Sequence, residues 1–188
     1  GTPVFANVEP DSLCLDPKDI EHRIGPKTKA ILVVHYLGHP TDMDPIMEIA
    51  NKYGLKVLED CAHATGSSYK GRMAGSIGDA GCFSFNYFKL ISAGEGGCVT
   101  TNDRKVYERT LIYHDSGAGF RPYAGELTEP VFMGMQLRTN EITAAIMREQ
   151  LKRMDGIISD LRKTKKQFID AIKNNDLFDI VPSNDEEG

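Results

Sequence analysis

The sequence contains no tryptophan and no apolar run as long as a membrane-spanning helix. It does not begin with a charged segment followed by an apolar leader, so we expect no secretory signal. The net charge of −5 disfavours a nucleic-acid-binding surface, because such surfaces attract phosphates with clustered lysine and arginine. We therefore expect a protein that binds neither membranes nor nucleic acids.

Cysteine is scarce and scattered. The four cysteines, Cys14, Cys61, Cys82 and Cys98, lack the Cys-x-x-Cys spacing of metal and redox sites. Cys61, Cys82 and Cys98 lie in apolar, strand-like segments, where a reduced and buried thiol is the ordinary outcome. Reduced thiols are typical of the cytoplasm, which is where we expect this protein.

The chain is rich in short apolar runs that alternate with amphipathic segments. With 40% hydrophobic residues, its 188 residues are sufficient for one substantial core. We predict strands over residues 4–8, 30–36, 56–59, 80–85 and 97–101, and we expect the run at 30–36 to be covered on both faces. We predict helices over residues 16–24, 44–54, 103–113 and 139–174, the last in one or two pieces around Gly156, and a loop over residues 115–134. This order predicts an α/β fold with a mainly parallel sheet and helices on both faces.

Three polar residues fall at or just after the ends of predicted strands, where α/β proteins gather ligands. Asp60 ends one strand, Ser84 lies near the end of the next, and Lys89 follows before a glycine-rich turn at residues 94–97. An amine for a Schiff base, a carboxylate for a pyridine nitrogen and a hydroxyl for a phosphate are the groups that pyridoxal phosphate (PLP) requires. The alternatives are a surface lysine, a turn aspartate and a plain strand-end serine.

Several sequence blocks occur in the order found in a known family. They cover residues 3–8, 34–44, 59–63, 78–85, 94–97 and 138–146, together with Lys89. On these blocks the chain resembles the middle of a sugar aminotransferase of the DegT/StrS type, with the aspartate-aminotransferase-like PLP fold type I. The resemblance implies a chain truncated at both ends. Residues 1–174 would be part of the large PLP-binding domain, and residues 175–188 the start of a truncated C-terminal domain.

The same resemblance implies roles for individual residues. Lys89 would be the catalytic residue that binds PLP as a Schiff base and moves protons, with pyridoxamine phosphate as the second form of the cofactor. Asp60 would pair with the pyridine nitrogen, Ser84 would bind the phosphate and His63 would lie beside the ring, although a lone histidine is more often an ordinary packed residue. Glu59 would point to the opposite face of its strand, which makes it the poorer carboxylate candidate. No metal site is expected.

The implied reaction transfers an amino group from an amino acid such as glutamate to a keto-sugar, nucleotide-linked or a related cyclitol, in amino-sugar biosynthesis. The implied assembly is a homodimer. The alternatives are a PLP-dependent sugar dehydratase of the same family, a catalytically silent regulatory relative and an α/β binding module without PLP. Lys89 favours transamination, because the dehydratase branch has histidine in its place. Gln136 departs from the usual asparagine, which puts in question the contact that this asparagine would make with the partner's cofactor phosphate.

Overall fold

The computed structural model describes residues 1–185, so the last three residues of the predicted C-terminal segment, 186–188, lie outside the described residues. The helices are α1 (Pro17–Arg23), α2 (Met43–Tyr53), α3 (Arg104–His114) and α4 (Glu141–Ile172), with short 3-10 turns at Tyr36–Gly38 and Pro122–Glu126. The strands are β1 (Ala30–Val34), β2 (Lys56–Asp60), β3 (Ser68–Tyr69), β4 (Arg72–Met73), β5 (Ala80–Ser84) and β6 (Gly97–Thr100). Within this part of the chain, no helix combines the length and apolar character needed to span a membrane.

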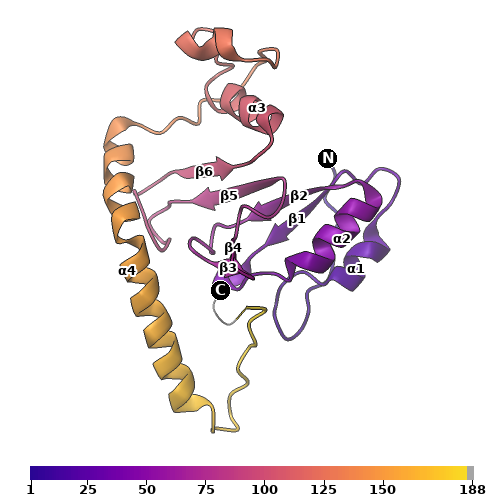
Figure 1. Cartoon of the computed structure of the whole chain (residues 1–188), viewed down its shortest axis with the longest axis vertical. Coiled ribbons are helices and arrows are strands. Elements are labelled where there is room, and N and C mark those ends of the chain that lie inside the picture. The colour runs from indigo at the N-terminus through magenta and orange to yellow at the C-terminus, as the bar shows by residue number, and fades with distance from the viewer. Residues whose placement is uncertain (186–188) are drawn as a thin grey trace.

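The main sheet has the strand order β1-β2-β5-β6. The strands β1, β2 and β5 are parallel, and β6 runs antiparallel at one edge (Figure 1). In the register, Val34 lies beside Asp60 and Asp60 beside Cys82. The carboxyl ends of the three parallel strands therefore meet at one edge of the sheet, which is where α/β proteins bind their ligands.

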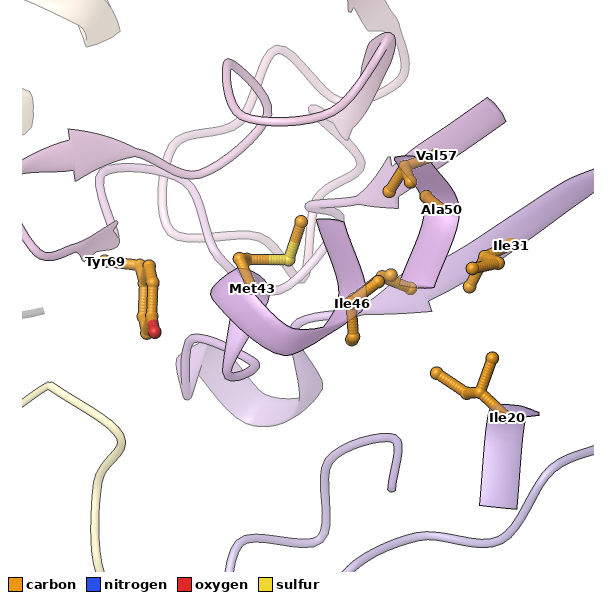
Figure 2. Packing of buried hydrophobic residues seen from close by; sticks show 8 residues of the cluster. Ile20, Ile31, Met43, Ile46, Ala50, Val57 and Tyr69 are labelled. Atoms are coloured by element: carbon orange, nitrogen blue, oxygen red, sulfur yellow. The ribbon is translucent and has the colours of Figure 1, made fainter. Parts of the chain in front are cut away.

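One face of the sheet packs on α1 and α2, and this contact forms the main core. The core side chains are Ile20, Ile31, Val33, Met43, Ile46, Ala50, Val57 and Tyr69. Figure 2 shows Met43, Ile46 and Ala50 on α2. A local signal marks the start of α1 and the end of α2. Asp16 caps α1 by accepting a hydrogen bond from the Lys18 backbone, and Gly54 ends α2 in the left-handed conformation.

The opposite face of the sheet is open, contrary to the prediction that residues 30–36 are covered on both faces. Along β1 burial alternates, and Leu32 is 61% exposed between the buried Ile31 and Val33. The reason is that α1 and α2 pack on the Ile31 side, and no described helix packs on Leu32. Cys82 on β5 is exposed as well, which corrects its predicted burial. This surface, with Leu32, Val34, Leu58, Cys82 and Val99, is called the open face below.

The long helix α4 is continuous from Glu141 to Ile172, so the alternative of two pieces around Gly156 is wrong. Its Met147 packs with Ile91 and Ala93 of the loop between β5 and β6, the loop that contains Lys89. Figure 1 shows α4 running along the side of the molecule next to this loop. The helix thus braces the segment that connects the two strands.

The predicted strand at residues 4–8 is absent. Only an isolated bridge from Val8 to Leu15 forms, and Val4 and Phe5 are exposed. A strand requires a neighbour to receive its backbone hydrogen bonds, and no described strand lies beside this segment. The helix predicted over residues 44–54 begins slightly earlier, at Met43, with Asp42 as the N-cap residue before it.

Candidate active site

Asp60 and Ser84 lie on the open face at neighbouring strand ends. Asp60 is paired with Cys82, and Ser84 comes two residues later on the same face of β5. One oxygen of the Asp60 carboxylate accepts a hydrogen bond from the Ala62 backbone at 2.9 Å. The Ser84 hydroxyl oxygen accepts from the Asn86 backbone at 3.4 Å, which leaves its proton available to an acceptor.

Lys89 lies in a tight turn directly after β5. Its backbone N–H donates to the Asn86 carbonyl at 2.9 Å, and the Asn86 side chain donates to Glu95 at 2.8 Å. The base of this turn is closed by Phe85, whose N–H donates to Gly96 and whose carbonyl accepts from Ala93. Lys89 is half-buried and forms no ion pair with any residue from 1 to 185. The turn therefore presents an unpaired amine five residues after Ser84.

His63 lies exposed in the loop after β2, and its ring is 6.2 Å from that of Tyr36. Tyr36 begins the 3-10 turn that follows β1, so both rings stand at the same edge of the sheet as Asp60. Tyr36 is not among the site residues predicted from the sequence. Its signal was an aromatic residue at the carboxyl end of a strand, and only the register shows that it meets His63.

The arrangement has the groups that PLP requires, although they do not contact one another directly. Among the described residues, no hydrogen bond or ion pair joins the Lys89 amine to Asp60 or Ser84. Each group keeps capacity for a ligand: Asp60 has a carboxylate oxygen and Ser84 a hydroxyl proton on the open face, and Lys89 has an amine in the turn after β5. This donor set fits a molecule that has an aldehyde, a ring nitrogen and a phosphate.

The cysteines around the site differ from the sequence prediction. Cys61 is buried as expected, and burial raises the pKa of its thiol well above the ordinary value. Cys82 and Cys98 are exposed, because β5 and β6 form the less covered half of the sheet. Partial burial still raises the pKa of both thiols, and the negative charge of Asp60 contributes for Cys82. The effect on Cys82 is consistent with its place beside Asp60.

A cavity of about 540 Å³ lies between β6, α3 and the start of α4. Its lining includes Glu95 of the glycine-rich turn, His114 and Arg138, but not Asp60, Ser84 or Lys89. Arg138 is held by Asp115, with 3.1 Å between the guanidinium Nε and the carboxylate, and its backbone N–H donates to the Gln136 side chain. The segment that follows the unusual Gln136 therefore shares this cavity with the glycine-rich turn.

Comparisons with known proteins show the family of this chain. The chain matches the DegT/DnrJ/EryC1/StrS aminotransferase family over residues 1–188. It is 41% identical over 176 residues to GDP-perosamine synthase of Escherichia coli O157:H7, a match that covers 93% of this chain and 46% of the relative. It is 35% identical over 194 residues to L-glutamine:2-deoxy-scyllo-inosose aminotransferase of Streptomyces lividus, with 100% of this chain and 45% of the relative covered.

A solved structure shows the same fold. E. coli GDP-4-keto-6-deoxy-D-mannose-3-dehydratase with bound hydrated PLP superposes with a TM-score of 0.81 at 29% identity, covering 91% of this chain and 47% of that structure. The chain spans about half the length of the relatives that it matches. It has the mainly parallel sheet of the PLP-dependent aminotransferases, as the sequence predicted. Because the match extends over every residue, this chain belongs to the DegT/DnrJ/EryC1/StrS aminotransferase family.

Proposed function

We propose that this chain is the cofactor-binding part of a PLP-dependent aminotransferase that transfers an amino group from an amino acid to a keto-sugar. The observation that carries the proposal is the register of β2 and β5. It places Asp60 and Ser84 on adjacent strand ends, with Lys89 in the turn that follows. When bound, PLP supplies an aldehyde and a ring that withdraws electrons from the reacting carbon.

In this proposal each residue has one task. Lys89 binds the cofactor covalently and afterwards moves a proton at the reacting carbon with its Nζ. Asp60 holds the ring nitrogen protonated through its carboxylate, Ser84 donates its hydroxyl proton to the phosphate, and His63 borders the ring together with Tyr36. Asp60 suits its task because one of its carboxylate oxygens already has a backbone donor, which fixes the direction of the other.

The substrate and donor follow from the names of the relatives. One relative is named for GDP-perosamine, and another for transfer from glutamine to a cyclitol ketone. We infer a nucleotide-linked keto-sugar as acceptor and an amino acid of the glutamate type as donor. Lys89 favours transamination over the dehydratase chemistry named for the structural neighbour.

A homodimer is part of the proposal, because Met133, Met135 and Leu137 are exposed beside the cavity at Arg138.

Covalent trapping tests the assignment of Lys89. Borohydride reduction of the full-length protein with PLP should leave the tag on the peptide that contains Lys89, and Lys89→Arg should abolish the tag. Lys70 is the internal control, since it is exposed, is held by Asp44 at 2.6 Å and lies outside the main sheet, between β3 and β4. A tag on Lys70, or an unchanged tag in Lys89→Arg, would refute the assignment.

A further inference from the structure

A buried carboxylate and a buried histidine form a hydrogen-bonded pair beneath the carboxyl end of β2. Glu59 and His35 are both fully buried, and His35 Nε2 lies 3.1 Å from Glu59 Oε2. The other ring nitrogen, Nδ1, accepts a hydrogen bond from the Thr41 backbone at 3.0 Å. Since Nδ1 is an acceptor, the proton is on Nε2, and His35 donates to Glu59.

Three backbone donors complete the environment of Glu59. Gly75 donates to the same oxygen as His35 at 2.8 Å, and Ile77 and Gly78 donate to the other at 2.8 and 2.6 Å. Burial alone would raise the pKa of Glu59, but the hydrogen bonds from His35 and from these three backbone groups outweigh it and hold the pKa below the ordinary value. The group is therefore an ionised carboxylate whose four acceptor positions are all occupied.

The same network is not a metal site, although the spacing would allow one. Ligand atoms of His35, Glu59 and Cys61 lie within 4.8 Å of one another. Every acceptor of Glu59 is taken, and Nδ1 of His35 is taken by Thr41, so an ion would have to displace existing hydrogen bonds. The pair connects parts of the chain rather than holding a ligand.

The pair connects two loops, and the first of them, 35–41, lies at the edge of the sheet where Asp60 ends β2. Loop 35–41 follows β1 and contains Tyr36, and loop 74–79 leads into β5. The His35 backbone also donates to the Asp60 carbonyl at 3.1 Å, and Ser67 donates to Gly38 at 3.0 Å. Loop 74–79 lies so close to the sheet that a Cβ on Gly75 would be 2.5 Å from the Phe83 ring. Both loops are thus anchored at the end of β2.

We propose that His35 and Glu59 are positioning residues for the cofactor site, an inference that rests on the proposed function. Consecutive side chains of a strand point to opposite faces, so anchoring Glu59 below the sheet fixes the direction of Asp60 above it. The same anchor holds loop 35–41, and with it the ring of Tyr36 against His63. The pair touches neither cofactor nor substrate; it acts through Asp60 and Tyr36.

The test variant is Glu59→Gln in the full-length protein. The glutamine side chain has the same shape, but its NH₂ group would face N–H donors that cannot turn away. We expect the PLP dissociation constant to rise about ten- to a hundredfold, the range found when partners that orient a ligating group are removed. We also expect the pH midpoint of the bound cofactor's visible absorbance to shift, because the distance from Asp60 to the ring nitrogen changes.

The matched control is Glu108→Gln. Glu108 is an equally buried carboxylate on α3 that accepts from the backbones of Thr128 and Glu129 and from Arg104. Both substitutions should lower the stability of the fold, but only Glu59→Gln should shift the absorbance midpoint. The titratable groups on the cofactor side, Asp60, His63, Cys82 and Lys89, are unchanged in both variants. An absorbance midpoint and dissociation constant in Glu59→Gln equal to those of Glu108→Gln would overturn the proposal.

A second variant covers the case in which Glu59→Gln does not fold. His35→Gln keeps an N–H donor for Glu59 but loses the rigid ring that Thr41 contacts, so it should shift the absorbance midpoint in the same direction by a smaller amount. No shift in a folded, PLP-loaded His35→Gln protein would also overturn the proposal. Failure of the unmodified protein to bind PLP would instead refute the proposed function, which keeps the two outcomes distinct.

Discussion

Two consecutive acidic residues show how strongly the surroundings decide what a side chain can do. Glu59 is buried under the sheet with all its acceptor positions filled, so it serves the fold. Asp60 is half-buried on the open face with acceptor capacity to spare, so it can serve a ligand. Peptide geometry separates them, because neighbouring side chains on a strand point to opposite faces.

The reactivity of the cysteines tests which face of the sheet each thiol occupies. In the full-length protein, a thiol reagent should modify Cys82 and Cys98 and spare Cys14 and Cys61, which are buried. PLP should slow the modification of Cys82 several-fold, because this thiol lies beside Asp60 on the open face. Cys98 is the control: it pairs with Phe83 on the other face of the sheet and should react at the same rate with and without PLP. Equal protection of the two thiols, measured by peptide mapping, would contradict this placement.

At the scale of elements, one glycine that ends a helix and one inside a helix allow a matched comparison. Gly54 ends α2 with a φ of +64°, and Gly156 lies inside α4; a Cβ at either position would meet no atom within 4 Å. Gly156→Ala should raise the free energy of unfolding by about 1 kcal/mol, because alanine is the better helix former. Gly54→Ala should lower it by about 1 kcal/mol, because an L-residue is strained in the left-handed conformation. Urea unfolding measures both, and changes of the same sign would contradict the argument from backbone conformation.

The elements that the sequence predicted well are those with local signals. Asp103 caps α3 and Gly54 ends α2 where the pattern placed them. The strand at residues 4–8 and the double-sided burial of β1 were wrong, since both depend on neighbours that lie elsewhere in the chain. The features of the site also fall into those predicted from local signals and those that depend on distant neighbours. The strand ends of Asp60 and Ser84 follow from the pattern, whereas the Tyr36–His63 contact and the His35–Glu59 pair exist only through the register of β1 and β2.

At the scale of the whole molecule, the proposed homodimer can be tested at residues 131–137. Met133 is 93% exposed in this segment, near the cavity at Arg138. Met133→Asp in the full-length protein should weaken dimerisation at least tenfold, because it places a charge in an apolar contact. Leu177→Asp is the control, since Leu177 is 86% exposed beyond the end of α4. Sedimentation velocity at micromolar concentration should show a shift towards monomer in the first variant alone; an unmodified protein that is a cofactor-loaded monomer would contradict the dimer.

The segment after α4 has a consequence for the order in which the chain folds. Asn184 donates to the Pro40 carbonyl at 2.9 Å, and this contact closes a loop of 144 residues. The unit from β1 through α2 to β2 forms within about thirty residues, so its contacts cost far less chain entropy at the start of folding. Doubling the length of a loop adds only about 0.6 kcal/mol to the free-energy cost of closing it, so this long loop can still close once the sheet has formed. We therefore expect the Asn184 contact to form late in folding, onto a loop that His35 and Glu59 already hold.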